Sequence, residues 1–126
     1  MGYTRYWERT NKAITEEFVK EVKTIIGDSL SKGIVICGWD GTGTPEITTE
    51  EISFNGNGSK NLDHETLFIG KETGFNFCKT ACKPYDYTVR KVLRAALKEG
   101  LIVSLSDDGT NEEIISDEDY LKRYRR

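Results

Sequence analysis

Two stretches of helical periodicity enclose a middle section of short strands, and this order limits the folds open to the chain. In the first stretch, apolar residues recur three or four positions apart from Ile14 to Leu30. The same spacing runs from Tyr85 to Leu97 in the second. The short apolar runs between them do not alternate with helices as βαβ units do. The order predicts an α+β fold, in which two long helices pack on a small antiparallel or mixed sheet.

The ends of the helices carry residues that commonly stand at such positions. Thr15 is suited to cap the start of the first helix, and Gly33 to end it. Pro84 fits the first position of the second helix. Ser116 followed by Asp119 resembles a capping arrangement, which predicts a short C-terminal helix.

Apolar runs rich in β-branched and aromatic residues predict the strands. These runs lie at 34–37, between Ile47 and Phe54, and at 67–69, 75–78 and 101–105. The first is short and wholly apolar, so we expect a buried strand there. The runs at 67–69 and 75–78 are separated by a loop around Gly70 to Gly74, and we expect them to pair in a meander.

Length and composition indicate one water-facing domain covering residues 1–126. Apolar residues make up 37% of the chain and charged residues 31%, which is an ordinary globular balance. A net charge of −3 and a pI near 5.3 argue against general nucleic-acid binding. The odd number of cysteines, three, favours reduced thiols and a cytoplasmic location. No apolar run approaches the roughly 20 residues needed to cross a bilayer, so no membrane partner is expected.

The segment with the most suggestive chemistry joins a strand to the second helix. Lys79, Thr80 and Lys83 precede the start of that helix, where unpaired N–H groups and a partial positive charge favour a phosphate or carboxylate. Asp86 lies in the first helical turn and could satisfy those donors internally. The sequence therefore leaves two interpretations open, an anion site and a well-capped junction.

The N-terminus carries an unusual aromatic load. Tyr3, Tyr6 and Trp7 could form a stacking platform for a base, with Arg5 supplying charge. The alternative is that these rings anchor the N-terminus to the core, and the sequence favours this alternative slightly for Trp7.

A glycine-rich loop at 38–45 has the glycines and hydroxyls of a phosphate cradle but fits neither the Walker pattern nor the dinucleotide fingerprint. An ordinary turn explains Asp40 and Gly41. Trp39 and the threonines remain as candidates for the wall of a pocket.

The single histidine and the cysteines offer weaker candidates for catalysis or metal binding. His64 stands between Asp63 and Glu65, but adjacent residues of an extended chain point to opposite faces. Cys78 and Cys82 are four positions apart without a second cysteine pair, so no zinc site is expected. Cys78 as a nucleophile with His64 as its base is a further possibility. We expect no cofactor and no metal.

Three motifs, Gly2–Trp7, Phe54–Gly56 and Phe77–Asp86, resemble those of a group of small phage and prophage proteins with no established activity. The resemblance implies a phage origin and marks a set of positions, but it does not imply a mechanism. The chain departs from the group at Arg5, where the group has histidine, and at Cys82, where it has arginine. A histidine-based role at the N-terminus is therefore not expected.

From the residues and the resemblance together, the first hypothesis is a non-enzymatic binding protein. It would capture a small anionic ligand, such as a nucleotide or a cyclic nucleotide immune signal. The predicted ligand-binding residues are Tyr3, Arg5, Tyr6, Trp7, Trp39, Asn55, Lys79, Thr80, Lys83, Tyr85 and Asp86. This hypothesis expects the N-terminal aromatic residues to lie close to the segment 79–86, within one chain or across a homo-oligomer.

Two alternatives belong to other functional classes. One is a phosphoester hydrolase, which would need His64 to converge with Asp40, Asp63 or Asp86. The other is an inhibitor module that binds a host protein through exposed aromatic residues at the N-terminus and at Trp39.

Overall fold

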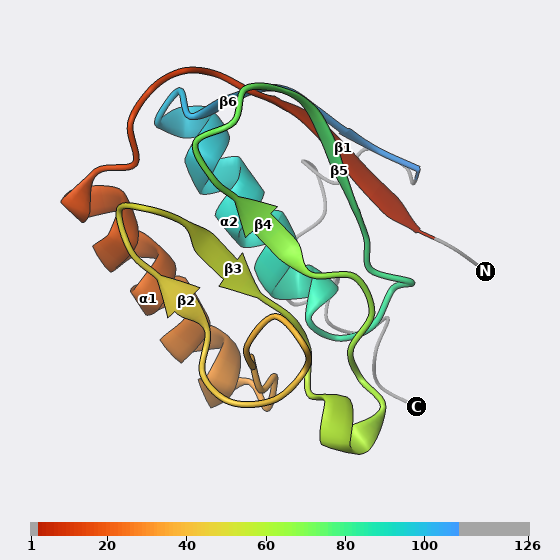
Figure 1. Cartoon of the computed structure of the whole chain (residues 1–126). Coiled ribbons are helices and arrows are strands. Elements are labelled where there is room, and N and C mark those ends of the chain that lie inside the picture. The colour runs from red at the N-terminus through yellow and green to blue at the C-terminus, as the bar shows by residue number, and fades with distance from the viewer. Residues whose placement is uncertain (1–2, 109–126) are drawn as a thin grey trace.

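The computed structural model describes residues 3–108, which contain two α-helices and six strands. Their order and packing are shown in Figure 1. The elements are β1 (Thr4–Arg9), α1 (Glu16–Ser31), β2 (Glu46–Ile47), β3 (Ile52–Phe54), the short 3₁₀ helix η1 (Gly58–Lys60), β4 (Leu67–Ile69), β5 (Gly74–Lys79), α2 (Asp86–Lys98) and β6 (Ile102–Asp107). The α+β class predicted from the sequence is confirmed. The predicted helix at 116–119 lies outside the described residues.

Both long helices begin and end close to the predicted residues. Thr15 caps α1 by accepting a hydrogen bond from the Phe18 N–H at 3.1 Å. Gly33 follows the helix in the left-handed region, at φ +83°, which glycine adopts without strain. In α2 the helix begins at Asp86, so Pro84 lies in the turn just before it. The apolar stripe of α2 is buried up to Ala96.

The strands form two antiparallel sheets of three strands, in the orders β5-β1-β6 and β2-β3-β4. The prediction that 67–69 and 75–78 pair in a meander is therefore wrong. The reason is the N-terminal segment, which becomes the central strand of the first sheet. β1 pairs with β5 through Tyr6 opposite Phe77, and with β6 through Tyr6 opposite Ser106. β5 therefore does not pair with β4, and β4 pairs with β3 instead.

The buried strand predicted at 34–37 is also wrong. Only Cys37 pairs, in an isolated bridge with Asn55, and Val35 is 43% exposed. The chain turns back at once, because the Gly38 N–H donates to the Thr42 carbonyl at 2.8 Å. A short apolar run next to such a turn has no neighbouring strand along its length, so it does not become one.

The two helices pack against each other and against both sheets around one core. In Figure 1 the β2-β3-β4 sheet lies in front of the helices, and the β5-β1-β6 sheet runs along the right-hand side. Ser29 of α1 and Thr88 of α2 share a buried hydrogen bond of 2.6 Å between their hydroxyls. Arg9 links the two sheets, since its Nε donates to the Gly70 carbonyl after β4 at 2.8 Å. Within residues 3–108, neither helix has the length and apolar character to cross a membrane.

Candidate functional site

The N-terminal strand and the segment 79–86 lie side by side, as the first hypothesis expected. Thr4 pairs with Lys79, and the Thr80 N–H donates to the Tyr3 carbonyl at 2.9 Å. The Arg5 guanidinium binds the Asp86 carboxylate through two hydrogen bonds, Nε to Oδ1 and Nη2 to Oδ2, each 2.8 Å long. The strand-to-helix junction and the N-terminus are thus one structural unit.

This unit is buried and already contains its own anion. Arg5, Thr80 and Asp86 are at most 2% exposed, and the Thr80 hydroxyl donates to Asp86 Oδ1 at 2.7 Å. Asp86 therefore occupies the position at Arg5 and Thr80 where an external anion would bind. Of the two interpretations left open for the junction, the contacts here support an internal structural role.

The stacking platform predicted from the N-terminal rings does not form. Trp7 is 1% exposed and Tyr3 8% exposed, so both anchor β1 to the interior. The Arg5 guanidinium lies over the Tyr3 ring, 5.2 Å from its centroid. Tyr6 is half-buried on the opposite side of the strand, and its hydroxyl donates to Asp108 at 2.9 Å.

The other predicted residues lie in different surroundings. Asn55 is buried and organises its loop, because its Nδ2 donates to the carbonyls of Trp39 and His64 at 3.1 and 2.9 Å. Trp39 is 69% exposed and Lys79 is exposed. Lys83 donates to the Asn61 carbonyl at 2.9 Å.

Two of the groups that a hydrolase would need, His64 and Asp40, are hydrogen-bonded to other partners. The His64 Nδ1 lies 2.8 Å from the Lys79 carbonyl, which identifies Nδ1 as the protonated nitrogen. Asp40 accepts hydrogen bonds from the N–H and the hydroxyl of Thr42, which lower the pKa of its carboxyl. Among residues 3–108 there is no group of three or more histidine, cysteine or acidic side chains placed to hold a metal.

Cys78 is not placed to act as a nucleophile with His64. Its side chain is fully buried, and burial raises the pKa of the thiol to about 12. Its Sγ lies 3.5 and 3.6 Å from the carbonyls of Glu65 and Thr66, both of which are backbone acceptors. These contacts do not support the possibility of a Cys78–His64 pair, because the buried thiol donates to backbone carbonyls.

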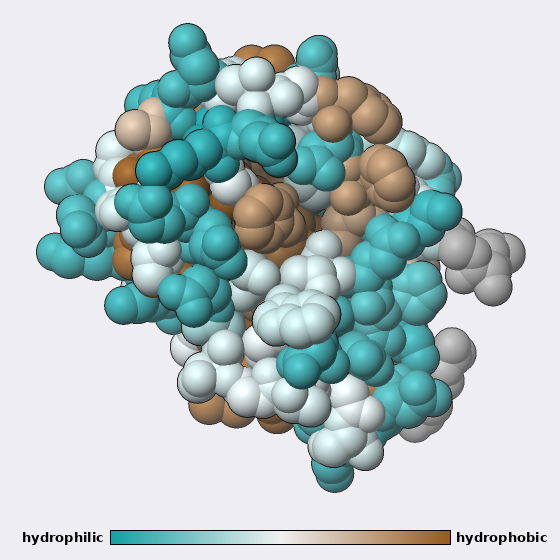
Figure 2. Space-filling view, viewed as in Figure 1, coloured by the Kyte–Doolittle hydropathy of each residue, from teal (hydrophilic) through white to brown (hydrophobic). Residues whose placement is uncertain are grey.

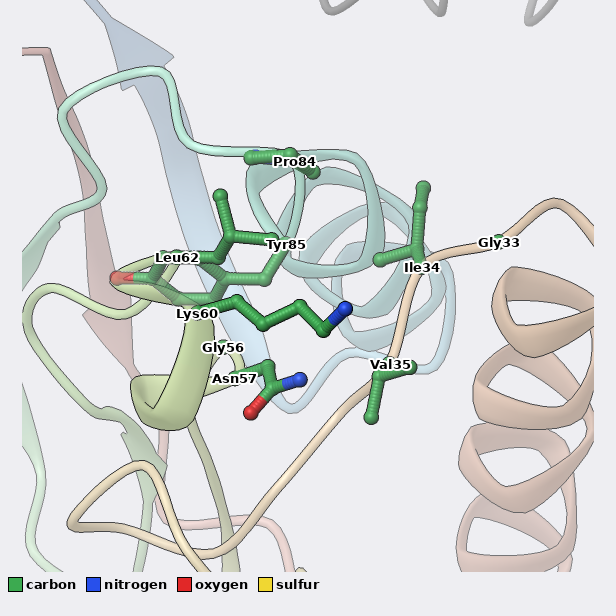
Figure 3. A pocket seen from close by; sticks show the side chains of 9 residues that line it. All are labelled: Gly33, Ile34, Val35, Gly56, Asn57, Lys60, Leu62, Pro84 and Tyr85. Atoms are coloured by element: carbon green, nitrogen blue, oxygen red, sulfur yellow. The ribbon is translucent and has the colours of Figure 1, made fainter.

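A small pocket of about 180 Å³ opens beside this unit, between the end of α1, the η1 loop and the start of α2 (Figure 3). Its walls are mostly apolar, and two polar side chains come from the η1 loop. The lining residues are Gly33, Ile34, Val35, Gly56, Asn57, Lys60, Leu62, Pro84 and Tyr85. Tyr85 is the only one of the predicted ligand-binding residues among them.

The floor of the pocket depends on a glycine. A Cβ atom on Gly56 would lie 2.1 Å from the Leu62 carbonyl oxygen and 3.0 Å from the Tyr85 ring. The absence of a side chain lets the η1 loop pack directly against Tyr85. The Tyr85 hydroxyl points away from the pocket and donates to the Glu65 carbonyl at 2.5 Å, so the ring alone faces the cavity.

The two polar side chains at the pocket present hydrogen-bond donors. Asn57 caps η1 through its Oδ1, which accepts from the N–H and the hydroxyl of Ser59 at 3.2 and 2.7 Å. This orients Asn57 Nδ2 toward the pocket (Figure 3). The Lys60 side chain extends beside the pocket, with its ammonium toward Ile34 and Val35. Within the described part of the chain, neither Lys60 Nζ nor Asn57 Nδ2 makes a hydrogen bond or ion pair.

The sequence did not identify Lys60 or Asn57 as candidates. By itself, the run Asn55-Gly56-Asn57-Gly58 is typical of a tight turn or exposed loop. The available signal was local, since an asparagine two residues before a serine favours a capped turn. That signal does not reveal that the turn will face the start of α2.

Comparison of the chain with protein-family models, with curated proteins and with solved structures gave no match.

Proposed function

We propose that this protein is a non-enzymatic binding protein that captures a small anionic ligand of the nucleotide class in the pocket between η1 and α2. The observation that carries the proposal is the pairing of two uncommitted donors, Lys60 Nζ and Asn57 Nδ2, with apolar walls. Small-molecule sites commonly combine an apolar lining with a few placed polar groups.

The chemistry of the pocket favours an anion with a flat or apolar body. The ammonium of Lys60 and the amide of Asn57 are both donors, which complements the oxygens of a phosphate or carboxylate. The Tyr85 ring, Pro84 and Leu62 offer apolar surface against which a base or a similar group packs. The volume of about 180 Å³ suits one such group and leaves the rest of the ligand at the mouth.

The biological role proposed for this binding is sequestration. The resemblance of the N-terminal and junction motifs to phage proteins suggests that the ligand is a nucleotide or cyclic nucleotide immune signal of the bacterial host. A sequestering protein needs affinity without turnover, which agrees with the engagement of His64, Asp40 and Asp86 with other groups of the fold.

The test is the thermal stability of the purified protein with a panel of mono-, di- and cyclic nucleotides, followed by mass analysis of each mixture. A ligand that binds only the folded state at 100 times its Kd adds about 2.7 kcal/mol of stability. For a domain of this size, that corresponds to a rise of roughly 5–15 °C in Tm. The matching nucleosides, which lack phosphate, serve as the ligand control.

Two variants locate the binding. Lys60→Met removes the cation at the pocket and is expected to lower the affinity for the stabilising nucleotide at least tenfold. Lys20→Met removes an exposed cation from α1 and is expected to leave the affinity unchanged. If no nucleotide raises the Tm, or if Lys60→Met binds as tightly as the native chain, the proposal fails. A stabilising nucleotide recovered in altered form would support the hydrolase instead.

A further inference from the structure

The β5-β1-β6 sheet has an outer face that no other described element covers. We define this outer face by the exposed and half-buried residues that share one side of the three strands: Tyr6, Glu8, Phe75, Phe77, Lys79, Val103 and Ser106. The alternate residues Arg5, Trp7 and Cys78 point inward and are buried. This is the two-residue alternation of a strand with one face in the core.

The outer face is unusually aromatic for a surface in contact with water. Phe75 is 68% exposed, Phe77 44% and Val103 46%. Tyr6 and Phe75 stack with ring centroids 6.2 Å apart, and the Phe75 and Phe77 centroids are also 6.2 Å apart. Figure 2 shows hydrophobic side chains gathered over the β1–β5 pair and over β4. A contiguous apolar patch of this kind marks an interaction site.

Glu8 and Lys79 on this face have a regular positional relation to the aromatic residues, and the Asp108 carboxylate lies beside them, 2.9 Å from the Tyr6 hydroxyl. Tyr6 pairs with Phe77. Glu8 lies two positions from Tyr6 along β1, and Lys79 lies two positions from Phe77 along β5, toward the opposite end of the sheet. The midpoint between Glu8 and Lys79 therefore falls between Tyr6 and Phe77. A twofold axis that runs parallel to the sheet above that point, and perpendicular to the line from Glu8 to Lys79, places Glu8 of each protomer over Lys79 of its partner.

We propose that the outer face is the interface of a homodimer, in which two copies of the sheet pack face to face about this axis. The two aromatic clusters form the centre, and two symmetry-related Glu8–Lys79 pairs form the rim. A self-complementary patch is what an isologous twofold interface requires. Two carboxylates, Glu8 and Asp108, stand against the single cation Lys79 at this face, which disfavours a polyanion, since a polyanion needs several cations along its track.

The size of the face sets the expected affinity. Three strands of up to six residues cover about 20 by 14 Å. An interface of this area belongs to the small, weakly associating class. We therefore expect the dimer to form at micromolar to tens-of-micromolar concentration, which is the range that sedimentation equilibrium must cover.

The experiment is a charge-swap series measured by analytical ultracentrifugation on the full chain. Glu8→Lys and Lys79→Glu each place like charges across both rim contacts and are expected to weaken the dimer at least about tenfold. An equimolar mixture of these two variants restores both pairs and is expected to form a heterodimer of native affinity. Glu17→Lys and Lys20→Glu on α1 are the matched controls, which are expected to dimerise normally alone and to gain nothing on mixing.

Phe75→Ser tests the apolar centre and is expected to yield a monomer with an unchanged circular dichroism spectrum, because Phe75 is exposed in the protomer. A native chain that stays monomeric through the whole concentration range overturns the proposal. So does a dimer that tolerates Phe75→Ser and both charge reversals, because its interface must lie elsewhere. Stabilisation of a monomeric chain by single-stranded oligonucleotide, lost in Phe75→Ser, would assign the face to nucleic acid and overturn the homodimer.

Discussion

Arg5 and Asp86 are 81 positions apart in the chain and form a two-pronged ion pair, with both hydrogen bonds 2.8 Å long. The pair joins the central strand β1 to the first residue of α2, and both side chains are almost completely buried. A buried pair of this kind is weak evidence for stability by itself, because two charges are removed from water. Removing only one of the two charges has a much clearer effect on the free energy of unfolding.

Asp86→Asn is expected to lower the free energy of unfolding by about 3–5 kcal/mol, because it leaves the Arg5 charge buried beside a neutral amide. The double variant Arg5→Met with Asp86→Leu is expected to lose less than the single change, since no charge remains buried. Chemical unfolding by urea measures both. A loss below about 1 kcal/mol for Asp86→Asn would show that Asp107, 3.4 Å from Arg5, compensates for it.

Gly56→Ala is expected to destabilise the fold and to abolish binding at the pocket, because its Cβ would overlap the Leu62 carbonyl oxygen. Gly27→Ala is the control. Gly27 lies within α1 with open space around its Cβ position, so alanine is expected to add about 0.5–1 kcal/mol of stability. Urea unfolding of the two variants should give changes of opposite sign. Equal effects would contradict the packing of η1 against Tyr85.

The three cysteines are expected to react with a thiol reagent in a fixed order, Cys82 first, then Cys37, and Cys78 only after unfolding. Cys82 is exposed, whereas burial and the nearby carboxylates of Asp40 and Asp63 raise the pKa of Cys37. At pH 8 a pKa of about 12 leaves on the order of a thousandfold less thiolate at Cys78 than at an ordinary cysteine. Mass analysis of labelled peptides over time measures the order. Labelling of Cys78 at the rate of Cys82 would contradict the burial of β5.

Asp28 is expected to titrate below an ordinary aspartate, because the ammonium of Lys32 lies 2.8 Å from its carboxylate and lowers its pKa. Because the folded pKa lies below the unfolded value, the Asp28–Lys32 pair stabilises the protein above about pH 4. This stabilisation is lost as the pH falls through the folded pKa of Asp28. The effect on stability is small, about 0.3–0.5 kcal/mol, since both groups are partly exposed. NMR titration of the carboxyl in the native chain and in Lys32→Met gives the direct comparison. Equal pKa values of Asp28 in the native chain and in Lys32→Met would contradict the ion pair.

Some features could be predicted from the sequence because their causes are local. The helices α1 and α2 follow from apolar spacing and from Thr15. For Trp7 the sequence slightly favoured an anchoring role, and the ring is 1% exposed. The strands predicted at 67–69 and 75–78 are confirmed, and in both places short β-branched and aromatic runs lie between turn residues.

The rest was decided only by the tertiary structure. Which strands pair depends on hydrogen bonds between residues far apart in the chain, and β1 pairs with both β5 and β6 although helices separate the three strands in the sequence. Long-range packing also explains why Arg5 and Asp86, which were candidate ligand contacts, form a buried pair. It likewise places Lys60 and Tyr85 at the same pocket. Local spacing determines how a segment folds, whereas the identity of its neighbours, and hence any site built between segments, depends on the assembly of the whole chain.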